Sequence, residues 1–452
     1  MKSINPASGE LVLDYAVHRE EQVLVKIRAA EDAFDAWRSR SFKERGAAMS
    51  AAAGRLRSEK SSLAQLITTE MGKPIAQAEA EIEKCAWGCE HYAEHAARYL
   101  ALQETKTDAS FSGVAYQPLG AILAIMPWNF PFWQVFRFAA PALMAGNVAV
   151  LKHASNVPGC AVAIEKLFSD AGFPPGVFSS LLIDSSAIEG VIGNPAIKAV
   201  TLTGSDKAGR SVAAAAGAQI KKTVLELGGS DPFIVLADAD LEQAVAGAVQ
   251  ARTQNAGQSC IAAKRFIVDK RIESEFTGSF VEAMRDLRVG DPMDRATQIG
   301  PMAREDLADD LHKQVKSSIA SGAELLTGGK RIDRPGFFYE PTVLSKVGPG
   351  MAAFDEETFG PVAAVIAADD EDDAIELANR TTFGLGATIW SSAPDRAREL
   401  AMRVDAGSVF VNGIVKSDPR LPCGGVKNSG YGRELSAEGI REFVNIKTLW
   451  VR

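Results

Sequence analysis

Short, almost entirely apolar runs recur along the first half of the chain, and they constrain its fold more than any other feature. Three of them are AILAIM (121–126), NVAVLK (147–152) and AVTLTG (199–204). Runs of this length suit parallel strands that are buried on both faces of a sheet. The helix-length segments between and after them are 132–145, 158–171 and 207–217. This repeated alternation predicts a doubly wound α/β sheet.

A second alternation of strands and helices begins near Asp231 and predicts a second α/β domain. Its segments are the apolar runs FIVL, KRFIVD, PVAAVIAA, GATIW and SVFVNG and the helix-like stretches 240–254 and 273–286. The segments 107–120 and 441–452 fit neither set and are interpreted as strands without helices of their own. Such strands often pair with another sheet, including that of a neighbouring subunit.

The length of 452 residues also exceeds one ordinary hydrophobic core. The predicted fold is α/β with three parts: a Rossmann-like cofactor domain, a second α/β catalytic domain and a small β flap for oligomerisation. The predicted boundaries are 1–106 with 121–229 for the cofactor domain, 230–430 for the catalytic domain, and 107–120 with 431–452 for the oligomerisation strands. We expect a homodimer or a tetramer built from dimers.

The charge and the cysteines limit the function classes. A formal net charge of −8 argues against a nucleic-acid or anionic-membrane partner. The N-terminal segment is too polar for a signal peptide, and no apolar run reaches the ~18 residues that a membrane span needs. Five cysteines in so long a chain do not form a disulfide framework. We therefore expect a cytoplasmic protein.

One group of potential metal ligands lies on a helix-like segment and consists of Cys85, Cys89, His91 and His95. Positions four apart share a helix face, so a metal site is conceivable. The two cysteines also belong to an apolar stripe, and the paired C-x2-C spacing is absent. Core packing is the favoured interpretation, and no metal is predicted.

Two residues carry candidate chemistry. Cys260 ends the motif NAGQSC between a predicted helix and a predicted strand, where loops often hold functional groups. No histidine lies nearby, so backbone dipoles, a cation or a carboxylate would have to activate the thiol. Glu226, in the strand end TVLELGG, supplies a carboxylate whose burial would raise its pKa toward the range of a general base. The alternative is a strand-end glutamate paired with a basic residue.

Two turns after buried strands add further polar groups. Asn129, in MPWNFPFW, follows a strand's C-terminal end, where its amide can stabilise an oxyanion. In TLTGSDKAG, Gly204 and Gly209 bracket a strand-to-helix turn, so Ser205 and the helix N-terminus can face a phosphate. Thiol, carboxylate, amide and phosphate site together indicate an enzyme with a dinucleotide cofactor.

These motifs closely resemble the aldehyde dehydrogenase superfamily. PWNFP, LELGGSDP, NAGQSC, EETFGPV and CGGVKNSGYGRE match that family in order and position, nearly end to end. The resemblance implies that Cys260 attacks the aldehyde while Asn129 and the Cys260 backbone N–H hold the oxyanion. It also implies that Glu226 activates the water that hydrolyses the thioester, and it makes Glu434 a candidate for proton relay.

The resemblance further implies a cofactor site. Its residues would be Lys152 at the adenine ribose, Trp128 and Ser205 at the pyrophosphate, Glu357 and Phe359 at the nicotinamide riboside, and Gly204, Gly209 and Leu227. Many NAD-preferring relatives carry a glutamate three residues after the lysine. Here that position is Ser155, whose hydroxyl can donate to a 2′-phosphate. We therefore expect NADP to be preferred and NAD to be usable.

Within the superfamily, the segments around Arg137 and Ser417 look like the short bacterial succinate-semialdehyde dehydrogenases. Arg137 lies on the apolar helix after Asn129, which favours a clamp for the distal carboxylate of an ω-semialdehyde, with Ser417 adding a hydrogen bond. The alternative is an arginine paired with a structural acid. The predicted reaction oxidises succinate semialdehyde to succinate and reduces NAD(P), through a cysteine thiohemiacetal and thioester.

Three positions depart from the patterns of this group. Animal members of the group carry a second carboxylate-binding arginine at the position of Gln254, and its absence here admits glutarate semialdehyde as a competing substrate. The animal members also carry, at the position of Ala262, a second cysteine that forms a redox switch. Cys423 occupies a tunnel position that phenylalanine commonly holds. Two rival classes are a CoA-acylating dehydrogenase, which would want no hydrolytic base, and a silent relative, which would have lost Cys260 or Glu226.

Overall fold

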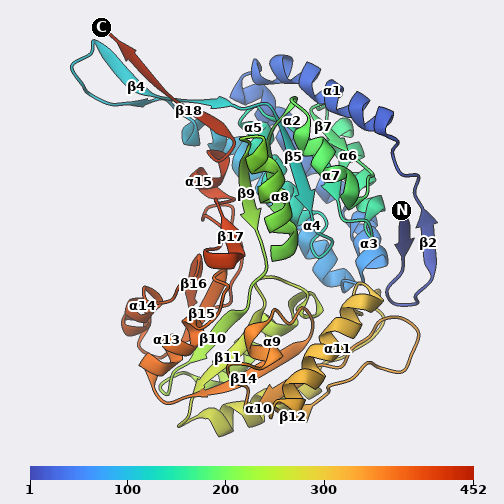
Figure 1. Cartoon of the computed structure of the whole chain (residues 1–452), viewed down its shortest axis with the longest axis vertical. Helices are drawn as coiled ribbons and strands as arrows, with labels where there is room; N and C mark the ends of the chain where they lie inside the picture. Colours follow the sequence, from blue (N-terminus) through green and yellow to red (C-terminus); the bar gives the residue numbers. More distant parts are fainter.

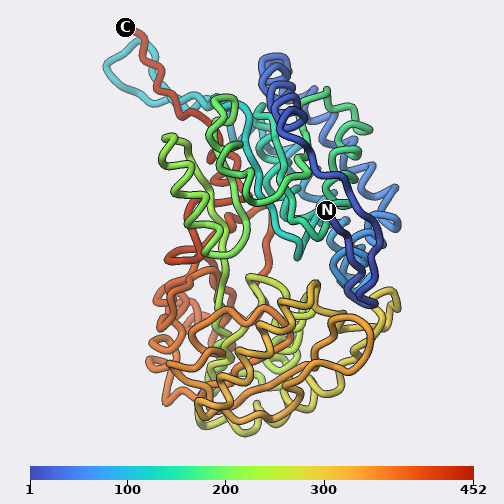
Figure 2. The backbone as a smooth tube through the Cα atoms, turned by 45° about the vertical axis from the view of Figure 1, so that its right-hand side comes forward, coloured from blue at the N-terminus to red at the C-terminus, as the bar shows by residue number.

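The computed structural model describes residues 1–452, and the chain forms two α/β lobes, each built on its own sheet (Figures 1 and 2). The first sheet has six strands in the order β17-β9-β8-β5-β6-β7. These strands are β5 (Ala121–Met126), β6 (Val148–His153), β7 (Phe178–Ser180), β8 (Ile197–Thr203), β9 (Lys222–Glu226) and β17 (Gly430–Tyr431). All neighbours run parallel except β17, which is antiparallel to β9. This confirms the predicted doubly wound sheet.

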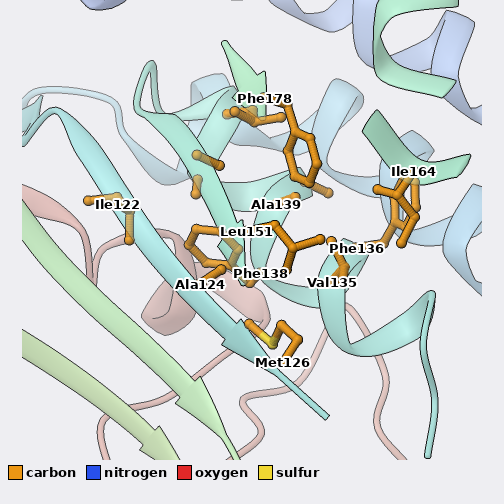
Figure 3. Packing of buried hydrophobic residues seen from close by; sticks show 14 of the residues in the cluster. Ile122, Ala124, Met126, Val135, Phe136, Phe138, Ala139, Leu151, Ile164 and Phe178 are labelled. Atoms are coloured by element: carbon orange, nitrogen blue, oxygen red, sulfur yellow. The ribbon is translucent and has the colours of Figure 1, made fainter. Parts of the chain in front are cut away.

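The first lobe also contains eight α-helices, most of which contact the strands of this sheet while the others pack on neighbouring helices. They are α1 (Glu20–Arg38), α2 (Phe42–Ser58), α3 (Lys60–Met71), α4 (Ile75–Tyr99), α5 (Trp133–Met144), α6 (Pro158–Asp170), α7 (Ile188–Gly193) and α8 (Asp206–Ala218), with the short η1 (Ser185–Ala187). Figure 3 shows Phe136 and Phe138 of α5 and Leu151 of β6, which all belong to one cluster of 72 buried residues. Every residue of α5 is buried, so this helix holds the turn before it firmly in place.

The second lobe contains a seven-stranded sheet in the order β12-β13-β14-β11-β10-β15-β16. Its strands are β10 (Asp231–Val235), β11 (Ala263–Asp269), β12 (Glu324–Thr327), β13 (Thr342–Ser345), β14 (Val362–Ala368), β15 (Gly386–Trp390) and β16 (Ser408–Val411). Its helices are α9 (Leu241–Thr253), α10 (Glu273–Arg285), α11 (Glu305–Ala320), α12 (Ala352–Asp355), α13 (Glu371–Asn379) and α14 (Pro394–Ala401), with η2 (Gln254–Gly257) and η3 (Lys427–Ser429). Only β12 is antiparallel to its neighbour, so the predicted second α/β unit is present.

A third, three-stranded sheet projects from the first lobe beside the C-terminus (Figure 1). Its strands are β3 (Gln103–Glu104), β4 (Phe111–Pro118) and β18 (Val444–Val451). Within the predicted oligomerisation segment 431–452, the part that pairs in this sheet is Val444–Val451. Tyr431 pairs with β9 through β17, and α15 (Ser436–Ile440) buries Ser436, Gly439 and Ile440 and packs on α4 and α5. The division into domains at the predicted boundaries stays a prediction.

Two remaining features complete the fold. The chain begins with a two-stranded hairpin, β1 (Lys2–Ile4) and β2 (Leu11–Asp14), beside α3 and α6. None of the helices is both long enough and apolar enough to span a bilayer.

Candidate active site

Cys260 follows a backbone segment held in an uncommon conformation. Asn255, Ala256 and Gly257 have φ angles of 55°, 53° and 75°, which place three consecutive residues in the left-handed region. A side chain at Gly257 would bring its Cβ to 2.2 Å from the carbonyl oxygen of Gly360. Strain of this kind persists only where the surroundings fix it, and it gathers at functional sites. The loop therefore holds the thiol in one place before β11.

Lys264, the second residue of β11, fixes the other side of the thiol. Its buried ammonium donates to the carbonyl oxygens of Ser259 at 2.9 Å and Cys260 at 2.6 Å. Burial raises the pKa of the Cys260 thiol to about 12, and the cations Lys264 and Arg137 oppose that rise only in part. The thiol is therefore neutral near pH 7 and needs a base or an added positive charge to react.

Glu226 ends β9, opposite Thr203 of β8 and Gly430 of β17. Only 2% of its surface is exposed, and its Oε1 has no hydrogen-bond partner. Burial raises the pKa of this carboxyl to about 7; Arg137 acts against the rise and Glu434 adds to it. A carboxyl group that ionises near pH 7 suits a general base.

Arg137 of α5 lies between two carboxylates. Its Nε contacts Glu434, and its Nη2 is 3.7 Å from Glu226 Oε2. Its Nη1 faces Cys423 Sγ at 3.6 Å. This is the arginine–acid pairing that the sequence left open as the alternative, and most of the guanidinium is engaged by it. Since Glu434 also raises the pKa of Glu226, the two carboxyls form one titrating system around one cation.

Asn129 and the Cys260 loop are joined by hydrogen bonds. The Asn129 side-chain nitrogen donates to the Gln258 carbonyl at 3.1 Å, and the Asn255 side-chain nitrogen donates to the Asn129 carbonyl at 2.8 Å. An amide nitrogen carries two hydrogens, so one remains for an oxyanion. The structure thus brings Asn129 of the first lobe next to the Cys260 loop of the second.

Among the predicted cofactor residues, Lys152 lines a cavity of about 660 Å³ in the first lobe. Leu202 lines it as well, together with serines 185, 186 and 211 and apolar residues of α7 and α8 that the sequence did not single out. Ser205 caps α8 by accepting from the Ala208 N–H, which leaves its own hydrogen free. Lysine, serines and a helix N-terminus are the donors that a nucleotide needs.

The two predicted glycines of the strand-to-helix turn have different surroundings. A Cβ on Gly209 would come within 2.5 Å of the Leu227 side chain, so this glycine is required for helix–strand packing. Gly204 would meet only ordinary contacts, so the geometry of the ligand-free chain does not require it. Leu227 and Gly209 line one small hollow together.

The nicotinamide-side residues also come together. The rings of Trp128 and Phe359 meet edge to face with centroids 5.7 Å apart. Glu357 accepts from the Gly229 N–H at 3.0 Å and lies 3.6 Å from the Lys264 ammonium, and burial raises its pKa. A Cβ on Gly228 would lie 2.5 Å from Glu357, so protein packing, rather than a ligand alone, demands this glycine.

Ser155 lies outside the 660 Å³ cavity. It lines a second hollow of about 680 Å³ with Lys2, Asp184 and Arg304. The two hollows are close, because Asp184 borders the second and its neighbour Ser185 borders the first.

Ser417 belongs to a polar group that the sequence analysis missed. Its hydroxyl accepts from Lys84 Nζ at 2.8 Å and from Trp133 Nε1 at 2.9 Å. Lys84 and Trp133, with Gln254, line a cavity of about 550 Å³. Lys84 carries no motif, and it lies 333 positions from Ser417 along the chain, so nothing in the local sequence marks it.

The three positions that depart from the pattern of the relatives lie in different parts of the structure. Cys423 lies 4.0 Å from Glu226 Oε2, and burial raises the pKa of its thiol to about 12. Ala262 is buried beside the catalytic loop, and Gln254 lines the 550 Å³ cavity. Among the potential metal ligands, Cys85 and Cys89 are buried in the core cluster, while the His91 ring bonds to the Tyr99 hydroxyl at 3.0 Å.

A thiol, a buried carboxyl and an amide donor at the junction of two α/β lobes, next to a doubly wound sheet with a nucleotide-sized cavity, define a cysteine-dependent enzyme that uses a dinucleotide. The chain belongs to the aldehyde dehydrogenase family, whose model matches residues 1–449. It is 52% identical, over 99% of both chains, to the Mycobacterium tuberculosis protein named succinate-semialdehyde dehydrogenase [NADP(+)] 1. It is 51% identical to the Mycobacterium avium protein named succinate-semialdehyde dehydrogenase [NADP(+)], over 99% of this chain and 96% of that one. A solved structure of succinic semialdehyde dehydrogenase from Streptococcus pyogenes with NADP+ superposes with a TM-score of 0.98, at 36% identity and over 100% and 99% of the two chains.

Proposed function

We propose that this chain oxidises succinate semialdehyde to succinate and reduces NADP+, with NAD+ as a usable second cofactor. The observation that carries the proposal is the 52% identity, over 99% of both chains, with a relative that bears that name. The cavity lined by Lys84 and Trp133, which both donate to Ser417, supports it, because cationic and hydroxyl donors suit an aldehyde with a distal carboxylate.

In the proposed reaction, Cys260 Sγ adds to the aldehyde carbon, and the thiol proton leaves toward ionised Glu226. The free hydrogen of the Asn129 amide and the Cys260 backbone N–H stabilise the oxyanion of the thiohemiacetal. When bound, the nicotinamide supplies the acceptor for the hydride, which leaves a thioester on Cys260. Glu226 must first lose the thiol proton, and Glu434 is the candidate that passes it onward. Glu226 then takes a proton from the water that attacks the thioester carbonyl, and the C–S bond breaks to release the carboxylic acid and the Cys260 thiolate.

The residues present fit a bound dinucleotide. Lys152 would hold the ribose in the 660 Å³ cavity, and Ser205 at the start of α8 would hold the pyrophosphate, with Gly204, Gly209 and Leu227 nearby. Trp128, Glu357 and Phe359 would hold the nicotinamide end. The edge-to-face pair of Trp128 and Phe359 would pack against the planar nicotinamide ring.

We also propose that the distal carboxylate binds near Arg137 and Ser417. Arg137 keeps one amino group, Nη1, that faces only Cys423, and the Ser417 hydroxyl contacts Lys84 and Trp133, which line the 550 Å³ cavity. Because Gln254 offers no cation there, glutarate semialdehyde stays a competing substrate.

A substrate panel tests the proposal. NADPH absorbance is followed with succinate semialdehyde, glutarate semialdehyde and butanal, each with and without CoA. We expect the highest kcat/KM with succinate semialdehyde and no requirement for CoA, because Glu226 supplies the hydrolytic base. Faster oxidation of butanal, or a strict need for CoA, would reject it.

Cofactor choice is tested at Ser155. A glutamate there would repel a 2′-phosphate, at a cost of a few kcal/mol per unit charge at ~4–5 Å and an effective dielectric of about 20. Ser155→Glu should therefore weaken NADP+ tens- to hundreds-fold while sparing NAD+. The measurement is kcat/KM for both cofactors, and an unchanged ratio would show that Ser155 does not contact the phosphate.

We further propose that the three-stranded sheet of β3, β4 and β18 is where a second copy of the chain binds, giving a homodimer or a tetramer built from dimers. The outer edge of β18 is unpaired, and Ile446, Trp450 and Val451 on it are exposed. Unpaired apolar edge strands are rarely left uncovered.

A further inference from the structure

The Ser417 hydroxyl has one hydrogen to spare. A hydroxyl oxygen has two acceptor lone pairs and one donor hydrogen. Lys84 Nζ and Trp133 Nε1 can only donate, and both donate to Ser417 Oγ, at 2.8 and 2.9 Å. Both lone pairs are therefore used, and the Ser417 hydrogen must find an acceptor that the chain itself does not provide.

The Lys84 ammonium has two further hydrogens without a protein acceptor. Its only hydrogen bond is to Ser417, it forms no ion pair, and it lies 4.6 Å from the centre of the Trp133 ring, which holds it in place. Lys84 lines the 550 Å³ cavity between Phe130, next to Asn129, and Gln254, just before the Cys260 loop. The cavity therefore contains a half-buried cation with no counter-charge.

The other charges around the cavity are already matched. Glu81 is the one acidic residue in the lining; it accepts from the backbone N–H groups of Phe132 and Trp133 and pairs with Lys73. Arg137 is engaged by Glu434 and Glu226. An anion that enters the cavity would thus meet Lys84 as its free partner.

We propose that Lys84, together with the Ser417 hydroxyl, binds the distal carboxylate of the aldehyde and sets the preference for charged over neutral substrates. This inference rests on the proposed function. Two N–H groups of Lys84 and the O–H of Ser417 would offer a carboxylate three donors on one side. Arg137 then adds positive potential from the adjoining helix.

The pKa of Lys84 gives the proposal a pH dependence. Burial lowers the pKa of this ammonium to about 8; Arg137 on α5 lowers it further, while Cys423 in the late loop and Glu81 and Cys85 on α4 raise it. The cation is the binding form, so carboxylate binding should weaken as the pH rises above the pKa. The titrations of Cys260 and Glu226 affect the oxidation of charged and neutral aldehydes alike. Their effects therefore cancel in the ratio of kcat/KM for the two kinds of substrate.

The test compares kcat/KM for succinate semialdehyde with kcat/KM for butanal in wild type, Lys84→Met, Lys84→Gln and Lys84→Arg. Both neutral variants should lower the ratio about tenfold or more, through KM, while arginine keeps most of it. Lys43→Met removes an exposed charge elsewhere and should keep the wild-type ratio. From pH 7 to 10 the ratio should fall in wild type and stay level in Lys84→Arg.

Inhibition by succinate distinguishes a failure of the Lys84 inference from a failure of the proposed function. Succinate should inhibit butanal oxidation, with an inhibition constant that rises about tenfold in Lys84→Gln. If wild type shows no preference for succinate semialdehyde over butanal, the proposed function fails. If wild type shows the preference but both neutral Lys84 variants keep the ratio and the succinate inhibition constant, only the Lys84 inference fails.

Discussion

Arg137 is almost fully buried between Glu434 and Glu226, so two carboxyls share one positive charge. Removing one member of a buried ion pair leaves the others without compensation and typically costs about 3–5 kcal/mol. Replacing Arg137 would therefore disturb the catalytic base together with the substrate pocket. Glu434, which touches the same cation from the other side, allows a finer test of how the base is set.

Glu434→Gln should shift the acid side of the pH–rate profile. Glu226 must be ionised to act as a base, so kcat should rise with pH through about 7, the pKa to which burial raises it. The negative charge of Glu434 adds to that rise, so its removal should move the rising limb to lower pH. The quantity compared is the ratio of the rate at pH 6 to the rate at pH 8 within each enzyme, so a loss of proton relay at both pH values cancels. A group of pKa 7 is about one-tenth ionised at pH 6, so Glu434→Gln can raise this ratio by up to about tenfold.

Glu438→Gln on α15 provides the control for this prediction, because Glu438 is exposed and hydrogen-bonded to Ser436. This variant should leave the rising limb of the pH–rate profile at the same pH as in wild type. A Glu434→Gln limb that coincides with wild type would show that the two carboxyls do not share a titration.

At the residue level, the sequence could predict the site residues that lie in recognisable motifs. Cys260, Glu226 and Asn129 stand in short, distinctive stretches, and the structure brings Asn129 and Glu226 to the Cys260 loop. It could not predict Lys84, because the contact with Ser417 joins positions 333 apart and depends on how α4 packs. The engagement of Arg137 by Glu434 was equally hidden, since both a clamp and an ion pair fit an arginine on an apolar helix.

At the level of elements, the strands and helices of both sheets were predictable because hydrophobic periodicity reports burial directly. The prediction for β5 agrees residue for residue, and those for α5, α6 and α8 agree within one or two residues. The left-handed run in η2 was not predictable, because Asn255 and Ala256 adopt it under tertiary constraint and not by preference. The short strand β17 was not predicted, because a strand of two residues shows no hydrophobic periodicity.

Gly257→Ala tests whether η2 holds the thiol in place. The residue has φ 75°, and an added Cβ would overlap the Gly360 carbonyl, so the variant should lose about 2 kcal/mol or more of stability. A displaced thiol should also lower kcat by about a hundredfold. Thermal unfolding and steady-state kinetics measure the two effects.

Gly278→Ala is the matched control. Gly278 lies inside α10 with nothing within 4 Å of an added Cβ, so alanine should stabilise the helix by about 0.5–1 kcal/mol and leave kcat as in wild type. Equal melting temperatures and rates for the two variants would show that η2 is not under strain.

At the level of the whole molecule, the site is assembled from both lobes, while the three-stranded sheet of β3, β4 and β18 projects away from them (Figure 1). Glu226 and Asn129 belong to the first lobe and Cys260 and Glu357 to the second, so chemistry requires the lobes to keep their mutual position. The β18 strand takes no part in the site. Its sequence, VNIKTLWV, places apolar side chains in solvent, which the fold of a single chain does not explain.

Trp450→Glu should therefore break the association of subunits. Trp450 is 52% exposed on an edge strand whose outer backbone groups are unpaired, and burying a new carboxylate against a second copy would be unfavourable. Light scattering coupled to size exclusion should show wild type as a dimer or tetramer and the variant as a smaller species at the same concentration. Met402→Glu, at an equally apolar and 86% exposed position after α14, should keep the wild-type mass. A monomeric wild type, or a variant of unchanged mass, would mean that β18 does not bind a second copy.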